Sequence, residues 1–295
     1  MTAPEGLSNL DAALVLGGAV CAALFGHWLG WRLVGHGRRL AVRAYAAGRG
    51  LARPTRPLRA RLARRFPRLW SWLQRRVEPR RFDGLALTLL VAAAVYLALL
   101  FAGLVEEVLE SYEIDAADDA IAAFVASYRN PYLITVFTWI TELGDMATLT
   151  AAAIVATGFL WARGPAAGIH AVWVTVAGSQ VTTWTGKFLI DRGRPDFELD
   201  VVAWSPSFPS GHATGAMAVY GIIAYVIARG LPTGHRRFAV IYWVAILIAA
   251  IGFSRIYLSV HHASDVAAGF LVGGFWVLAG IAVLEYSRLS LNSRD

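Results

Sequence analysis

Residues 238–285 read FAVIYWVAILIAAIGFSRIYLSVHHASDVAAGFLVGGFWVLAGIAVLE and carry the pattern that decides the fold. They contain two apolar stretches, 238–255 and 263–285, each long enough as a helix to cross the ~30 Å hydrocarbon core of a bilayer. Polar residues, among them Arg255 and His261, stand at the junction of the two stretches. We therefore expect a pair of membrane helices whose connecting turn gathers polar side chains at one membrane face.

Five further apolar stretches precede this pair. They lie at 12–34, 85–105, 144–162, 166–190 and 211–229. The chain is 57% hydrophobic and 16% charged, which excludes an ordinary soluble globule. The first stretch has no basic region ahead of it, so we expect a retained helix rather than a cleaved signal peptide. The pattern predicts an all-α fold, a polytopic bundle of membrane helices with an extra helix at its N-terminal end.

The net charge of +7 is concentrated between the first two membrane stretches, because residues 35–84 hold 15 arginines and no lysine. A nucleic-acid arm is one interpretation of such a run. The position between two membrane helices favours a cytoplasmic loop instead, and we expect no nucleic-acid partner. The piece around Phe66 and Trp72 has the composition of an amphipathic segment on an anionic leaflet. We divide the chain into 1–84, with the extra helix and the arginine-rich segment, and 85–295, with six helices.

Placing 35–84 inside fixes the side of every later loop. The short loops then assigned to the cytoplasm are all basic, and the acidic segment 106–119 falls outside. The cluster that begins at Lys187, the loop 196–210 and the turn 255–262 fall on the same extracytoplasmic side. We expect a multi-pass protein of the bacterial plasma (inner) membrane whose site faces the outside.

The run 132–161 is too long for one crossing, so we expect 132–143 to form a separate interfacial piece. Glu142 and Asp145 stand at the boundary with the crossing helix. Acidic residues near membrane depth are functional candidates, although a cap or a structural ion pair explains these two equally well. The only cysteine, Cys21, excludes intramolecular disulfides and a cysteine-built metal site.

Lys187 is the only lysine among 27 lysine and arginine residues, and it opens the sequence KFLIDRGRP that ends in Arg194-Pro195. A lysine ammonium is a compact point charge that suits a single phosphate oxygen, whereas arginine suits bidentate contacts. The cluster therefore suggests an anion site, although a basic residue at a helix end commonly just reaches the interface. Asp191 and Arg192 are left out of the predicted site, with bracing of Arg194 as their simplest role.

Pro209-Ser210-Gly211-His212 stands where an apolar helix begins. A helix N-terminus presents unpaired backbone N–H groups and a partial positive charge, which favour an anion. Ser210 adds a hydroxyl donor, and Gly211 lets the backbone approach a ligand closely. His212 would then lie beside the anion, although a lone histidine at a helix start is more often a cap or a surface residue.

His261 and Asp265 are four residues apart after Ser254-Arg255. On a helix these positions share a face, so Asp265 is expected to accept the Nδ1 proton of His261 and aim its Nε2 outward. Such a pair activates a nucleophilic imidazole, and the alternative is a structural ion pair at the helix start. Helical rotation is expected to turn His262 away from Asp265.

Together, Lys-x6-Arg-Pro, Pro-Ser-Gly-His and Ser-Arg-x5-His-x3-Asp resemble the signature of the type 2 phosphatidic acid phosphatases. That family shares its site with glucose-6-phosphatase, bacterial acid phosphatases and vanadium haloperoxidases. The resemblance covers about 85–295, matches every specified position, and implies a six-helix membrane phosphatase core. It further implies a metal-independent hydrolase with no cofactor. The implied partner is a lipid phosphate or pyrophosphate of the phosphatidic acid, phosphatidylglycerol phosphate or undecaprenyl pyrophosphate class.

The resemblance also implies the roles of the matching residues. His261 would form a phosphohistidine, Asp265 would hold its tautomer, and His212 would protonate the leaving oxygen. The implied phosphate-binding residues are Lys187, Arg194, Ser210, Gly211 and Arg255. Three alternatives remain: a lipid phosphotransferase, a haloperoxidase, whose relatives are soluble, and a non-catalytic lipid transporter. The presence of the nucleophile and its carboxylate disfavours the transporter. The sequence does not indicate an oligomeric state.

Overall fold

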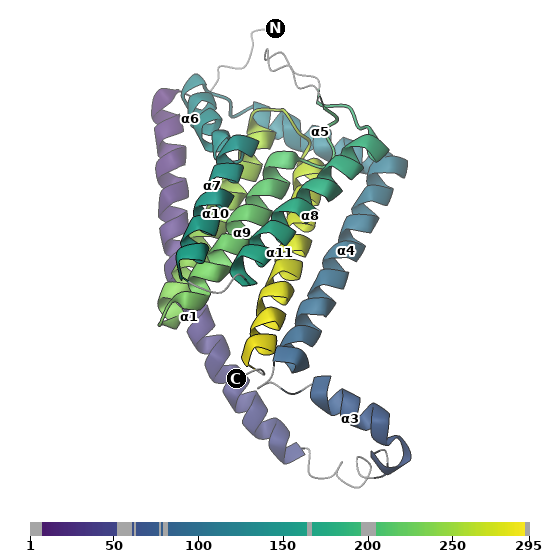
Figure 1. The fold of residues 1–295 in the computed structure, drawn as a ribbon. Helices are drawn as coiled ribbons and strands as arrows, with labels where there is room; N and C mark the ends of the chain where they lie inside the picture. Colours follow the sequence, from purple (N-terminus) through teal and green to yellow (C-terminus); the bar gives the residue numbers. More distant parts are fainter. Residues whose placement is uncertain are drawn as a thin grey trace. The chain divides into compact units, whose positions relative to one another are not determined.

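The computed structural model describes residues 8–51, 61, 63–76, 78, 82–163, 167–195 and 205–292, and the regular structure of these residues is helical throughout (Figure 1). The helices are α1 (Asn9–Leu51), α3 (Pro67–Arg76), the π-helix η1 (Phe82–Ala86), α4 (Leu87–Glu110), α5 (Tyr112–Ala126), α6 (Pro131–Glu142), α7 (Met146–Arg163), α8 (Ala167–Ile190), α9 (Gly211–Gly230), α10 (Gly234–Tyr257) and α11 (Ala263–Asn292). The predicted all-α membrane bundle is confirmed.

The chain divides into two compact units. One is Ala19–Ala92, and the other combines Met1–Gly18 with Ala93–Asp295 and contains helices α5 to α11. The first residues of α1 pack with the larger unit, where Ala12 joins a buried cluster with Val125, Leu133 and Tyr257. The predicted division of the chain into an N-terminal part, 1–84, and a six-helix core, 85–295, stays a prediction.

In the smaller unit, α3 matches the predicted amphipathic piece. Leu69, Trp72 and Leu73 are exposed apolar side chains, and the Arg76 guanidinium lies 5.5 Å from the centroid of the Trp72 ring. Arginine stems and aromatic rings on one short helix suit a membrane interface. Contact with anionic lipid stays a prediction.

Six of the seven predicted membrane stretches fall in helices that are long and apolar enough to span a bilayer. These helices are Asn9–Ala41, Gly84–Glu110, Met146–Arg163, Gly211–Gly230, Gly234–Tyr257 and Ala263–Leu289. The seventh stretch forms α8, which at 24 residues is also long enough to cross but is more polar than the others.

The polarity of α8 is concentrated on one buried face. Thr175, Ser179, Thr183 and Lys187 recur every fourth residue, so they lie in one row along the helix, and all four are buried. The hydroxyl of Thr175 donates to the carbonyl of Ala171 at 2.8 Å, as serine and threonine in membrane helices commonly do. The polar face points into the bundle, so its side chains do not contact lipid.

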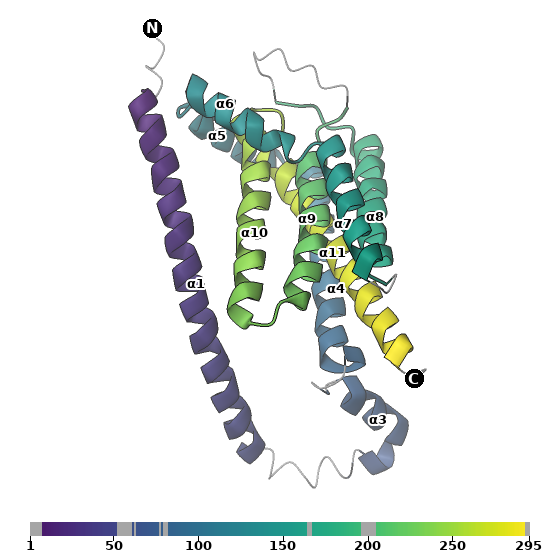
Figure 2. The same ribbon diagram turned by 60° about the vertical axis from the view of Figure 1, so that its left-hand side comes forward.

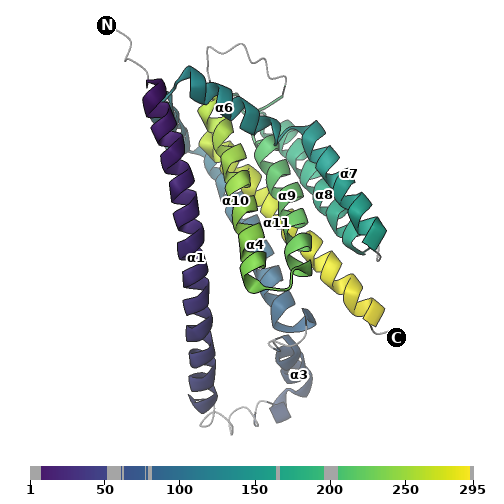
Figure 3. The ribbon, with the colours of Figure 1, turned by 90° about the vertical axis from the view of Figure 1, so that its left-hand side faces the viewer.

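Helix α9 lies at the centre of the larger unit, in contact with α7, α8, α10 and α11 (Figures 1 and 3). Its first turns approach α11 closely at Gly269 and Gly273. A Cβ atom at these two positions would lie 2.8 Å from the carbonyl oxygen of Ser210 and 2.7 Å from that of Thr214, respectively. Small residues of this kind let membrane helices pack backbone to backbone. This contact fixes the start of α9 against the start of α11.

Helices α5 and α6 cover one end of this bundle (Figure 2). Each begins at a side-chain cap, because Ser111 accepts from the N–H of Glu113 at 3.1 Å and Asn130 accepts from that of Tyr132 at 2.8 Å. The predicted break in the run 132–161 is present, since α6 ends at Glu142 and α7 begins at Met146.

Candidate active site

Helix ends at the α5 and α6 end of the bundle carry the predicted site residues (Figure 1). Lys187 lies in the last turn of α8, and Arg194 follows that helix. Arg255 lies in the last turn of α10. The first turns of α9 and α11 supply His212 and Asp265. Segments distant in the sequence thus deliver their polar side chains to one place.

His261 and Asp265 form a buried pair. The Nδ1 of His261 is 3.4 Å from Oδ2 of Asp265, and the two residues are 4% and 0% exposed. Because a carboxylate only accepts hydrogen bonds, Nδ1 carries the proton and Nε2 keeps its lone pair. The predicted shared helix face is wrong, however, because His261 lies in the turn before α11. The backbone N–H of His262 donates to the same Oδ2 at 3.0 Å, so this turn fixes the carboxylate as well.

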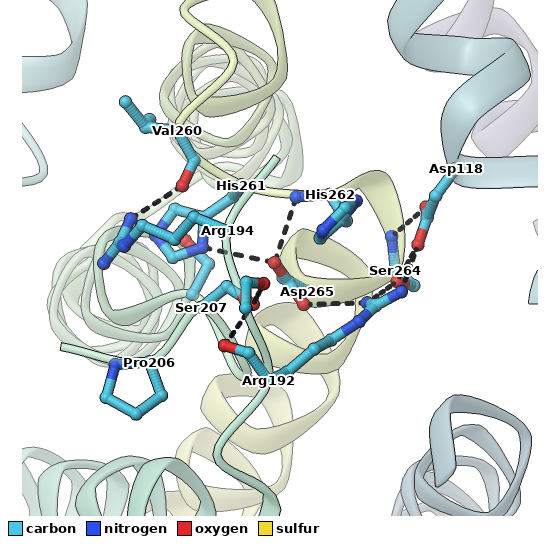
Figure 4. A network of polar contacts seen from close by, with 12 residues as sticks. Asp118, Arg192, Arg194, Pro206, Ser207, Val260, His261, His262, Ser264 and Asp265 are labelled. Carbon is cyan, nitrogen blue, oxygen red and sulfur yellow. Dashed lines mark hydrogen bonds and ion pairs between the residues drawn. The ribbon is translucent and has the colours of Figure 1, made fainter. Parts of the chain in front are cut away.

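The other oxygen of Asp265 is held by Arg192 (Figure 4). The Nη1 of Arg192 donates to Oδ1 of Asp265 at 3.0 Å and to the hydroxyl of Ser264 at 2.6 Å. Its Nη2 donates to Asp115 at 2.7 Å and to the buried Asp118 at 3.0 Å. Asp118 also accepts from the backbone N–H of Ser264 at 3.0 Å. Arg192 therefore joins α5 to the start of α11 and does not serve to brace Arg194.

Arg194 lies on the opposite side of His261 from this network (Figure 4). Its Nη1 donates to the carbonyl of Val260 at 2.6 Å and lies 3.5 Å from Nε2 of His261. Its Nε donates to the carbonyl of Ser205 at 3.0 Å. The guanidinium of Arg194 thus lies beside Nε2 of His261, whose lone pair would attack a phosphorus atom.

Lys187 and the start of α9 form another wall of the site. The Nζ of Lys187 donates to the carbonyl of Pro206. Ser210 is the N-cap of α9, and its backbone N–H donates to the carbonyl of Asp265 at 3.0 Å. Its hydroxyl oxygen is fully buried and has no hydrogen-bond partner among the described residues. Gly211 follows as the first residue of the helix. An anion at this N-terminus would satisfy the hydroxyl of Ser210.

His212 and Arg255 complete the cluster beside the break between α6 and α7. A Cβ atom on Gly144 would lie 3.3 Å from the His212 ring and 2.5 Å from Ile251, so only glycine fits there. The Nη1 of Arg255 donates to the hydroxyl of Thr141 at 2.7 Å. Its Nε is buried without a partner among the described residues. A bound anion would supply that partner.

Positive charge dominates the site. Arg194 and Arg255 repel the ammonium of Lys187, and the carboxylate of Asp265 attracts it. Burial also lowers the pKa of Arg194. Three cations held this close, in surroundings that exclude much of the solvent, are stabilised by an anion placed between them.

Burial lowers the pKa of His261 to about 4. Asp265 acts to raise this pKa, whereas the charges of Arg255 and Arg194 lower it further. The imidazole is therefore neutral at pH 7, as a nucleophile requires. Burial acts to lower the pKa of Arg192 too, but its carboxylate partners, led by Asp115, outweigh burial and raise it. Arg192 thus remains a charged anchor for Asp265.

Glu142 and Asp145 lie near this cluster without belonging to it. Asp145 accepts from the backbone N–H of Ala147 at 2.9 Å, which caps the start of α7. Both carboxylates attract Arg255 electrostatically. The cap interpretation of Asp145 fits this geometry. In the described part of the chain, no group of three or more histidine, cysteine, aspartate or glutamate residues is arranged to hold a metal ion.

Known proteins resemble this chain in sequence and in fold. The model of the PAP2 superfamily matches residues 167–289. Phosphatidylglycerophosphatase B of Bacillus subtilis is 36% identical over 163 residues, which cover 54% of this chain and 79% of that protein. The chain belongs to the PAP2 superfamily. The lipid A 1-phosphatase of Rhizobium etli is 30% identical over 148 residues, 44% of this chain and 58% of that protein.

A solved structure of a PAP2 protein agrees with the helical bundle. The crystal structure of a transmembrane PAP2 type phosphatidylglycerolphosphate phosphatase from B. subtilis superposes with a TM-score of 0.60 at 29% identity, covering 64% of this chain and 94% of that one. The predicted family is confirmed, and with it the prediction that the chain is a phosphatase. It is also a multi-pass integral membrane protein.

The PAP2 signature includes neither Arg192 nor Asp118, and sequence reasoning missed both as parts of the site. Arg192 stands two residues before Arg194, in the same basic cluster. Asp118 is one of seven acidic residues in 106–119, and no spacing distinguishes it from the others. The position of Arg192 inside the first motif indicates that it lies near the site, but it does not indicate that its partner is Asp118.

Replacing Arg192 by glutamine should lower kcat about 30-fold and leave KM nearly unchanged. The change removes a charged hydrogen bond worth ~2 kcal/mol, so Asp265 is held less firmly behind His261. Steady-state kinetics would separate the two parameters, with Arg192→Lys as the conservative control that restores part of kcat. A raised KM with an unchanged kcat would mean that Arg192 binds the phosphate itself and does not position Asp265.

Proposed function

We propose that the protein hydrolyses a lipid phosphate or lipid pyrophosphate through a phosphohistidine on His261, at the extracytoplasmic face of the membrane. The observation that carries this proposal is the buried imidazole of His261, held at Nδ1 by a buried carboxylate, with its Nε2 turned toward Arg194. A nucleophile, an anion pocket and a helix N-terminus at the end of membrane helices suit a phosphate at headgroup level. The names of the relatives, phosphatidylglycerophosphatase and lipid A 1-phosphatase, support a lipid substrate.

In the first step, Nε2 of His261 attacks phosphorus and the bond from phosphorus to the leaving oxygen breaks. Asp265 stabilises the positive charge that develops on the ring. His212 gives a proton to the leaving oxygen, which departs as the lipid alcohol or, from a pyrophosphate, as the lipid monophosphate. Lys187, Arg194 and the start of α9 stabilise the charge on the other phosphoryl oxygens.

In the second step, water attacks the phosphohistidine. His212, now neutral, takes a proton from the attacking water while the bond between phosphorus and nitrogen breaks. Inorganic phosphate leaves and His261 returns to its neutral form. His212 thus carries one proton to the leaving oxygen and regains one from water, and the cations of the site balance the charge of the phosphoryl group.

The distribution of arginines supports an outward-facing site. Helix α7 ends at Arg163, and the last turns of α11 contain Arg288. Arg229 lies in the last turn of α9, and Arg236 and Arg237 lie in the first turn of α10. These residues lie at the helix ends opposite to the site. Because basic residues remain on the cytoplasmic side, the site is assigned to the other side.

The test of this proposal is phosphate release by the purified protein from phosphatidic acid, phosphatidylglycerol phosphate and undecaprenyl pyrophosphate in detergent. We expect release from at least one lipid in the presence of EDTA, with inhibition by vanadate. A water-soluble monoester such as glycerol 3-phosphate should be a much poorer substrate. Equal turnover of the soluble monoester and every lipid would contradict a lipid phosphatase.

The kcat/KM of the free enzyme should fall as the pH drops through about 4, where His261 becomes protonated and loses its lone pair. A lipid phosphate monoester has its second pKa at about 6, so the charge of the substrate stays nearly constant around pH 4, where His261 titrates. Assays between roughly pH 3.5 and pH 6 locate the midpoint. Activity recovered on return to pH 7 excludes acid unfolding as the cause. A midpoint near the ordinary histidine value of 6.5 would contradict the buried, neutral nucleophile.

A further inference from the structure

A groove of about 720 Å³ runs between α7, α8 and α9, away from the active site. Its walls are apolar and include Ala156, Phe159, Ile223 and Val226. Arg163, the last residue of α7, is the only charged residue among the described residues that line it. The three helices lie side by side in the larger unit (Figure 3). Within a bilayer, an apolar groove of this volume is suited to a hydrocarbon chain.

The depth of the groove sets it apart from the catalytic end. Along α9, the first groove residue, Tyr220, lies ~12 Å below His212, and the last turn at Gly230 lies ~27 Å below it, at 1.5 Å per residue. Half of a hydrocarbon core is only ~15 Å. Most of the groove therefore belongs to the leaflet opposite to the site. The acyl chain of a glycerolipid held by its phosphate at the site would end near the groove's upper edge.

Two arginines lie at the end of the groove that is far from the active site. Arg163 is exposed and lines the groove. Arg237 is exposed too, and its Nε donates at 2.8 Å to the carbonyl of Leu231, which is also a lining residue. An arginine within the interfacial region attracts the phosphate of an anionic lipid. Apolar walls with basic residues at one end match the two parts of a phospholipid.

We propose that this groove binds an acyl chain of an anionic phospholipid from the leaflet opposite to the active site, with the lipid phosphate beside Arg163 and Arg237. The occupant is a structural lipid and not the substrate, because its headgroup lies at the far end of the helices. By filling the space between α7 and α9, the lipid supports two helices whose other ends lie at the active site, where Gly144 precedes α7 and His212 lies in the first turn of α9.

The test uses the full chain in nanodiscs that contain phosphatidylglycerol with a photoreactive diazirine near the end of one acyl chain. Phosphatidylglycerol carries a phosphodiester, so its binding does not depend on the proposed hydrolysis. We expect cross-links on peptides from 152–163 and 220–231. Ala156→Trp, which fills the groove, should abolish them, whereas Ile154→Trp, at an exposed position on the same helix, should leave them unchanged.

The headgroup contact is tested by Arg163→Gln and Arg237→Gln, both at exposed positions where folding should be preserved. Each is expected to reduce cross-linking about fivefold, equivalent to ~1 kcal/mol per arginine near a charged membrane surface. Cross-linking of a matching phosphatidylcholine probe should be weaker than that of phosphatidylglycerol in the wild type. Equal labelling of Ala156→Trp and Ile154→Trp, or equal labelling by the two lipids, would overturn the proposal. Labelling of the groove by diazirine-bearing phosphatidic acid alone would assign it to the substrate tail.

Discussion

His261→Ala should lose at least about 10⁴-fold in kcat, because the variant lacks the imidazole that is proposed to form the bond to phosphorus. The remaining cations would still bind the lipid phosphate, so substrate binding should change far less than turnover. The measurement is phosphate release per protein at saturating lipid, on a variant whose thermal unfolding matches that of the wild type.

His262→Ala is the matched control for this variant. It removes the neighbouring imidazole but keeps the backbone N–H that donates to Asp265. We expect its kcat to stay within about threefold of the wild type, as for a side chain outside the reaction. A folded His261→Ala variant that keeps more than a few per cent of activity would rule out His261 as the nucleophile.

His212→Ala should show a loss that depends on the leaving group. On a phosphate monoester the departing alkoxide needs a proton, and removal of a general acid typically costs about 10²- to 10⁴-fold. On a lipid pyrophosphate the departing group is an acidic phosphate, so the loss in the first step should be smaller. Parallel kcat/KM values for phosphatidic acid and a polyprenyl pyrophosphate test this difference.

The same comparison with Arg255→Lys provides the control for His212. The guanidinium of Arg255 has a buried Nε that a bound phosphate would partner, and it takes no part in proton transfer. Lysine keeps the charge but loses this hydrogen bond, so both substrates should be weakened by similar factors. Equal losses on both substrates in His212→Ala would contradict its assignment as the general acid. They would favour a role for His212 in binding the phosphate.

The membrane helices and the site motifs could be predicted from the sequence because both depend on local patterns. An apolar stretch of membrane length predicts a crossing, and the spacing from His261 to Asp265 predicted their contact. The reason given for that contact was wrong, because His261 belongs to a turn and not to the helix. A separation of four residues allows the contact in both conformations, and spacing alone does not distinguish them.

The partners of Arg192 could not be predicted in the same way. Its bond to Asp118 joins residues 74 positions apart, and the bonds between Asp118 and Ser264 join residues 146 positions apart. Such pairs depend on how α5 lies across the end of the bundle, and this arrangement has no periodic signal. The polar face of α8 is similar, because its four-residue repeat predicts a shared face without indicating which helices cover it.

The central claim is the covalent bond between phosphorus and His261, and a trapping experiment tests it most directly. The enzyme is mixed with a lipid pyrophosphate labelled with ³²P at its terminal phosphate and quenched with alkali within one turnover. We predict a label that is stable in base and labile in acid, on the peptide that contains His261, and absent from His261→Ala. Turnover without any covalent label, or a label on another residue, would contradict the account.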